Sequence, residues 1–181
     1  MVENQKRIDL YNMDNTLGDI RNDKHMQVTA NRIKKHEGKE YTPYQLEYKG
    51  NMDSKVKENF YTVGYGHKIT GEVKDIYTGD EIEAFFQEDF KKAQDGALRL
   101  LKGAAIKPEA FGILTEMVYQ MGENGVSKFK KTLDFLRAGE YAQASFEMLK
   151  GNKDGTVSNW ALQTPDRAYE ASEIMLRLQD K

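Results

Sequence analysis

The sequence predicts an α+β fold, in which a small irregular β-region near the N-terminus is followed by a mainly helical body. Residues 41–70 are rich in tyrosine, threonine, valine and glycine and include turn formers such as Gly50 and Asn51, which indicates two or three short strands. From Thr78 onward, apolar residues recur at helical spacing between residues that typically start and end helices. We expect a ligand cleft where the β-region and the helical body meet.

A first helix is expected just before the β-region. Met26, Ala30 and Ile33 recur at helical spacing, and Gly38 is of the residue type that ends helices. The pattern therefore places Glu37 at a helix C-terminus.

The helices of the body are expected from their start and stop signals. Thr78 and Glu81 form a capping box, which is followed by a long apolar face from Ile82 to Leu101. Further helices are expected over 108–122, opened by Pro108 with Phe111, Leu114, Val118 and Met121 inward and Gly122 at its end, over 129–136, over 141–149 and from Pro165 onward.

Composition narrows the classes of function. A chain of 181 residues fits one domain, and Lys+Arg 27 against Asp+Glu 29 leaves no basic excess for binding nucleic acid. No apolar run approaches the roughly 20 residues that span a bilayer, and the start lacks the apolar middle of a signal peptide. We therefore expect a soluble protein without a polynucleotide partner and without membrane insertion.

The residue types available for chemistry favour carboxylates. The chain has no cysteine and three histidines, so we expect neither thiol chemistry nor a metal site. Residues 1–25 show little apolar periodicity and are interpreted as an N-terminal extension or tether, and residues 26–181 as the folded domain.

Glu37 is the candidate general acid. The C-terminus of a helix carries partial negative charge, which together with partial burial favours the neutral, proton-donating form of a carboxyl group. The alternative is a solvated surface glutamate, and position alone does not decide between the two.

Four motifs in order resemble one enzyme family. They are HEG at 36–38, YTVGYGHKIT at 61–70, MVYQMGENGV at 117–126 and WALQTPDRA at 160–168. Together they resemble the phage-type lysozymes of glycoside hydrolase family 24. This resemblance implies a lysozyme-like fold and a muramidase that hydrolyses the β-1,4 bond between N-acetylmuramic acid and N-acetylglucosamine in bacterial peptidoglycan without a cofactor. It also implies a phage protein that degrades the host wall from the periplasm, either as an endolysin made in the host cytoplasm or as a virion component.

The resemblance assigns roles on the acid side of the site. Glu37 matches the catalytic acid, and Thr62 matches the threonine whose hydroxyl helps to place the attacking water. Gly64 and Gly66 would let the backbone lie close to a sugar ring, although a tight turn explains them equally well. His67 is expected to form a structural ion pair with an acidic residue of the following helix, at Asp89.

It also assigns substrate contacts. Gln120 matches a position that contacts the glycan, and Tyr119 is expected either to offer its ring to a sugar or to pack in the core. Arg167 matches the arginine next to the catalytic glutamate, where a charge-assisted bond would favour the ionised carboxylate and oppose the effect of burial.

Three of the motif residues have an ordinary structural interpretation. Thr164 and Pro165 are expected to cap and open the last helix. Trp160, the single tryptophan, is expected in the core.

The catalytic base is a departure from the family pattern. Position 46, where the family has an aspartate or sometimes another residue, is leucine, and the segment from Glu37 to Thr62 is longer than usual. We favour Glu47, three residues after Tyr44, as the base, with Asp53 as the alternative and Glu58 as a third candidate. An inverting hydrolysis requires the two carboxyl groups to lie roughly 6.5–9.5 Å apart, so that a water fits between them.

Two other functions stay open. A lytic transglycosylase on the same fold needs only the glutamate acid/base and leaves anhydro products. A non-catalytic virion domain would only bind peptidoglycan, and residues 1–25 could attach it to other virion proteins.

Overall fold

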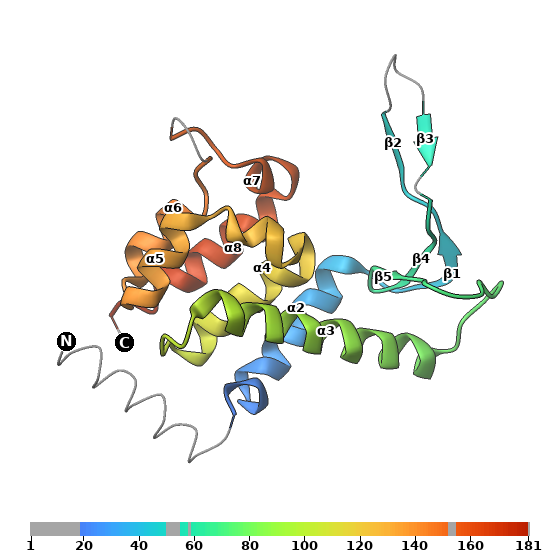
Figure 1. The fold of residues 1–181 in the computed structure, drawn as a ribbon, viewed down its shortest axis with the longest axis horizontal. Coiled ribbons are helices and arrows are strands. Elements are labelled where there is room, and N and C mark those ends of the chain that lie inside the picture. The colour runs from blue at the N-terminus through green and yellow to red at the C-terminus, as the bar shows by residue number, and fades with distance from the viewer. Residues whose placement is uncertain (1–18, 50–54, 58, 152–154, 181) are drawn as a thin grey trace. The chain divides into compact units, whose positions relative to one another are not determined.

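The computed structural model describes residues 19–49, 55–57, 59–151 and 155–180, and its elements confirm the α+β fold (Figure 1). The chain forms two compact units, which we call the sheet unit (residues 31–91) and the helical unit (residues 92–181 with the chain up to residue 30). Helices α2 (His25–Glu37) and α3 (Gly79–Leu101) contribute residues to both units.

The sheet unit holds more strands than the sequence predicts. Strands β1 (Glu40–Tyr44), β4 (Thr62–Gly64) and β5 (His67–Lys68) form an antiparallel sheet in the order β1-β4-β5. The expectation of two or three strands is wrong, because β2 (Glu47–Lys49) and β3 (Lys55–Lys57) form a second, two-stranded sheet. In Figure 1 this hairpin extends beyond the ends of β1 and β4.

Helix α2 ends where the sequence predicts. Gly38 has a φ of 73°, and its N–H donates to the carbonyl of Lys34 at 3.1 Å. The last helical residue is Glu37, so the predicted place of this carboxylate at the helix C-terminus is confirmed.

The capping box at the start of α3 is also confirmed. The backbone N–H of Thr78 donates to Glu81 Oε2 at 2.9 Å, and the N–H of Glu81 donates to Thr78 Oγ1 at 3.2 Å. Most of the predicted apolar face is buried, namely Ile82, Phe86, Phe90, Ala93, Ala97 and Leu101, while Phe85 and Leu98 are half-buried.

The core of the sheet unit joins β4 to α3. Val63, Tyr77 and Ile82 are buried together, and Tyr65, Ile69 and Phe85 pack against them. Gly64 has a φ of 64°, and a Cβ added there would lie 2.8 Å from Cγ2 of Ile82. Glycine is therefore required at this position by both backbone conformation and packing.

The helical unit follows most of the predicted start and stop signals, but α4 (Pro108–Ser127) continues past its expected end and α7 (Asn159–Gln163) is a helix that the sequence does not predict. Its other helices are α5 (Lys130–Ala138), α6 (Tyr141–Glu147) and α8 (Pro165–Leu176). Helix α4 does not stop at Gly122: this residue is non-helical, with φ 72° and ψ 162°, and helix resumes beyond the kink. Met121, expected inward, is only half-buried, because it precedes this kink. In the described part of the chain, no helix is both long enough and apolar enough to cross a membrane.

Thr164 stands at the predicted N-cap position of α8, where its carbonyl accepts from the N–H of Ala168 at 3.0 Å, and Pro165 opens the helix. Its side chain makes no capping bond, because the hydroxyl donates to the carbonyl of Trp160 at 3.0 Å and accepts from Nε2 of Gln120 at 3.1 Å. Trp160 is 5% exposed, which confirms its expected place in the core.

Within the helical unit, residues just before α2 are bound to α3. Arg21 Nη1 donates to Asp95 at 2.6 Å, and Nε2 of Gln94 donates to the carbonyl of Arg21 at 3.0 Å. The hydrogen bond from Arg21 also lowers the pKa of Asp19. Residues 1–18 of the predicted extension lie outside the described residues, and its boundary at residue 25 stays a prediction.

Replacing Gly64 by alanine tests the contact with α3. We expect Gly64→Ala to lower the free energy of unfolding by about 2–4 kcal/mol, from the left-handed backbone and the clash with Ile82. Gly38→Ala is the matched control, because its φ is also positive but nothing lies within 4 Å of the added Cβ. Equal losses in the two variants, measured by urea unfolding, would show that the close packing contributes nothing.

The bonds that Glu81 makes with Lys74 and in the capping box make the start of α3 sensitive to acid. The hydrogen bonds from Lys74 and from the backbone of Thr78 lower the pKa of Glu81 to about 2, from 4.5. Because the folded-state pKa is depressed, this stabilisation is present above about pH 4.5 and is lost as the pH falls toward 2. The melting temperature of the wild type should therefore exceed that of Glu81→Gln at pH 7. The difference between the two melting temperatures should vanish near pH 2.

Asp80→Asn is the control for this comparison, since Asp80 is an exposed acid in the same first turn of α3. If Asp80→Asn reproduces the full difference in melting temperature at pH 7, the difference arises from the helix dipole and not from the bonds of Glu81 with Lys74 and Thr78.

Candidate functional site

The carboxylate of Glu37 faces the turn between β4 and β5. Glu37 is half-buried, and its Oε2 would lie 3.5 Å from a Cβ added at Gly66. Gly66 stands in the turn Tyr65–Gly66 that joins the two strands, with a φ of 88°. The structure thus brings together the predicted acid and one of the predicted sugar-approach glycines. At Gly64, by contrast, the space for a side chain is taken by Ile82.

The C-terminal end of α2 is held to α3 by Lys34, one turn before Glu37. Lys34 Nζ binds the carboxylate of Glu83 on α3 at 2.7 and 2.8 Å and lies 4.4 Å from the ring centroid of Phe86. The hydrogen bond from Lys34 lowers the pKa of Glu83. This ion pair fixes the last turn of α2, from which Glu37 projects.

Thr62 lies in the buried strand β4. It is 4% exposed and pairs with Tyr44 of β1 and with Lys68 of β5. Its backbone position is therefore set on both sides by neighbouring strands, while its role toward water stays a prediction.

Of the three candidate bases, only Glu47 lies among the described residues. Glu47 is the first residue of β2, is exposed, and lies opposite Lys57 of β3 in register. Asp53 and Glu58 lie outside the described residues. The assignment of the base stays a prediction.

The predicted pairing of His67 with Asp89 is confirmed as a direct contact. His67 Nδ1 lies 2.8 Å from Asp89 Oδ2, and the imidazole stacks on Phe85 at 4.2 Å with an interplanar angle of 3°. These contacts connect β5 to α3, so His67 has a structural role in the sheet unit.

In the helical unit, Gln120 is held by two neighbours. Nε1 of Trp160 donates to Gln120 Oε1 at 2.8 Å, and Gln120 Nε2 donates to Thr164 Oγ1 at 3.1 Å. The orientation of the amide follows from these partners, because the indole N–H can only donate. Tyr119 beside it is half-buried, so both of its expected roles remain open.

Arg167 is bound to a residue that the sequence analysis missed. Its Nε donates to Oε1 of Glu116 at 3.1 Å, and the two side chains are 8% and 2% exposed. The available signal was a single acidic residue inside the apolar run FGILTEMV. Only the fold identifies its partner, since the two residues are 51 positions apart.

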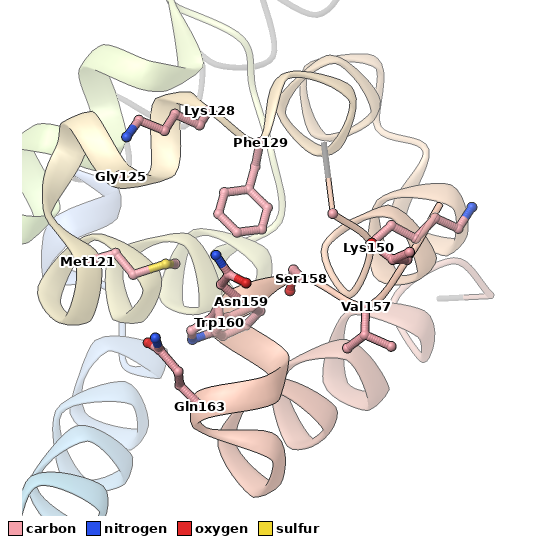
Figure 2. A pocket seen from close by; sticks show the side chains of 12 residues that line it. Met121, Gly125, Lys128, Phe129, Lys150, Val157, Ser158, Asn159, Trp160 and Gln163 are labelled. Carbon is pink, nitrogen blue, oxygen red and sulfur yellow. The ribbon is translucent and has the colours of Figure 1, made fainter. Parts of the chain in front are cut away.

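A pocket of about 470 Å³ lies in the helical unit beside this network (Figure 2). In Figure 2, Phe129, Met121 and Asn159 point into it, whereas the ammonium ends of Lys128 and Lys150 point away from its centre. Its volume lies in the range of small-molecule sites. The lining residues are Met121, Gly125, Lys128, Phe129, Lys150, Gly151, Thr156, Val157, Ser158, Asn159, Trp160 and Gln163.

Comparison with known proteins agrees with this fold and these motifs. A family model described as phage lysozyme matches residues 34–164, so the chain belongs to the phage lysozyme family. It is similar to an endolysin of Bacillus phage B103, with 30% identity over 131 residues that cover 71% of this chain and 46% of that protein. It is also similar to probable T4-type lysozyme 2 of Dictyostelium discoideum, with 28% identity over 66% of this chain and 82% of that protein. The chain thus spans less than half of the phage endolysin.

The link between Trp160 and Gln120 can be measured. Trp160→Phe keeps an aromatic ring but leaves the amide oxygen of Gln120 without its donor, and we expect a loss of about 1–2 kcal/mol in the free energy of unfolding. In the Gln120→Leu background the same substitution should cost less. Urea unfolding of the four proteins gives the coupling, and a coupling of zero would contradict the assigned bond.

Proposed function

We propose that this chain is a muramidase of glycoside hydrolase family 24, which hydrolyses the β-1,4 bond between N-acetylmuramic acid and N-acetylglucosamine in bacterial peptidoglycan without a cofactor. The observation that carries the proposal is the position of Glu37, at the end of α2 with its carboxylate against the Gly66 turn. Membership of the phage lysozyme family supports it.

Glu37 is the proposed general acid. In its neutral form it donates a proton to the glycosidic oxygen as the bond from that oxygen to the anomeric carbon breaks. The absence of a side chain at Gly66 leaves the space beside Glu37 Oε2 open to the substrate.

Glu47 and Thr62 are proposed to act on the water. Thr62 holds the water through its hydroxyl, and Glu47 takes the proton as the new bond to the anomeric carbon forms. Tyr44 pairs with Thr62 and lies three residues before Glu47, which supports this assignment. Asp53 is the alternative base.

Gly66, Tyr119, Gln120 and Arg167 are the proposed substrate contacts. For Gln120 and Arg167, the support is that both side chains are fixed by protein partners, which lowers the entropy lost when a ligand binds.

The proposed partner is the glycan strand of a bacterial wall. We propose that the chain acts on it in the periplasm, as a phage endolysin or as a virion component attached through residues 1–25. The name of the Bacillus phage relative supports the endolysin. Two other relatives come from Dictyostelium discoideum, which is not a phage. The phage origin of this chain is therefore part of the proposal.

Turbidity clearing and release of muropeptides from purified peptidoglycan test the function. We expect Glu37→Gln to lose at least about 100-fold in rate, because the proton donor is removed. One of Glu47→Gln and Asp53→Asn should lose a comparable factor and so identify the base. Glu40→Gln, an exposed acid on β1, is the matched control and should retain activity.

Mass spectrometry of the products distinguishes the competing functions. Reducing ends support the hydrolase. Anhydro ends, with Glu37→Gln inactive and both other variants active, would support a lytic transglycosylase, a possibility that Leu46 raises because it stands where the family has its base. Binding without cleavage by wild type would contradict any enzymatic function and leave a peptidoglycan-binding domain.

A further inference from the structure

Glu116 is a carboxylate in the most apolar part of α4. It is 2% exposed, and every other residue from Ala110 to Val118 is also buried. A charged group so placed is costly unless it is paired and hydrogen-bonded. A glutamate at this position therefore needs a reason beyond helix packing.

Its partner is one of the proposed substrate contacts. The Nε–H of Arg167, on the first turns of α8, donates to Glu116 Oε1 at 3.1 Å. A guanidinium is planar and rigid, so a bond at Nε sets the direction of its other nitrogens. Glu116 thereby fixes the orientation of the whole group.

The same face of α4 holds the second proposed contact. Gln120 lies one turn after Glu116 and is bound to Trp160 and Thr164, just before α8. Two side chains on one face of α4 thus hold the stretch 160–167 at three residues, Trp160, Thr164 and Arg167. Both connections involve residues that are proposed to touch the glycan.

We propose that Glu116 is a positioning residue of the glycosidase: it holds the guanidinium of Arg167 in the orientation that binds the glycan. This inference rests on the proposed function. A purely structural ion pair would stabilise the helical unit without affecting how substrate binds.

Steady-state kinetics on solubilised peptidoglycan strands test the role. Glu116→Ala should raise KM about tenfold while kcat changes less than about twofold, because an interaction made equally in the ground state and the transition state is lost. Glu116→Gln keeps an oxygen that can accept from Nε and should stay within about threefold of the wild-type KM. Glu116→Asp keeps the charge but shortens the side chain, so it should raise KM.

Two controls separate positioning from stability. Thr115→Val removes a buried hydroxyl that has no hydrogen-bond partner in the described structure, on the neighbouring residue of α4, and should leave KM unchanged. Leu136→Ala opens a cavity at a buried residue of α5, which lies in neither α4 nor α8, and destabilises the helical unit. Circular dichroism confirms that each variant is folded at the assay temperature, and Glu116→Asp replaces Glu116→Ala should the latter fail to fold.

The outcomes are decisive in either direction. A wild-type KM in the folded Glu116→Ala and Glu116→Asp variants, with a lowered melting temperature, would overturn the positioning role. If wild type releases no muropeptides, the proposed function fails by itself. Sedimentation with insoluble peptidoglycan then decides: about tenfold weaker binding by Glu116→Asp supports positioning of a binding group, and equal binding overturns it.

Discussion

The sheet unit depends on the close approach of Gly64 to Ile82. Because no side chain stands at Gly64, strand β4 lies directly against α3, and Val63 and Tyr77 are buried around the contact. The chain then turns at Tyr65–Gly66, and β5 carries His67 to its partner Asp89 on the same helix. The turn that faces Glu37 is therefore held by α3 at its two ends.

The helical unit is held differently, by a small number of polar hydrogen bonds between side chains in an apolar surrounding. The Glu116–Arg167 pair and the amide of Gln120 connect α4 with the junction of α7 and α8. In a medium of low dielectric constant these bonds are directional and costly to leave unmade. They therefore specify one arrangement of side chains, where apolar contacts alone would tolerate several.

Local signals made most of the fold predictable from the sequence. The end of α2 at Gly38, the capping box of Thr78 and Glu81 and the start of α4 at Pro108 depend on residues within one helical turn. What was missed depends on distant partners. Strands β2 and β3 have three residues each and form only by pairing with each other. The hydroxyl of Thr164 accepts from Nε2 of Gln120, and Glu116 pairs with Arg167 across 51 positions. In the candidate site, the position of Glu37 could be predicted for the same local reason, whereas the base could not.

The register of the sheet bears on that base. Thr62 pairs with Tyr44, and the Cα atoms of paired residues in adjacent antiparallel strands lie about 4.5–5.5 Å apart. Each residue of extended chain adds at most about 3.3–3.6 Å, so the backbone of Glu47 lies within about 11 Å of Tyr44. Asp53 lies outside the described residues, so the structure sets no such limit for it. The described register therefore supports Glu47 as a carboxylate that can share a water with Thr62.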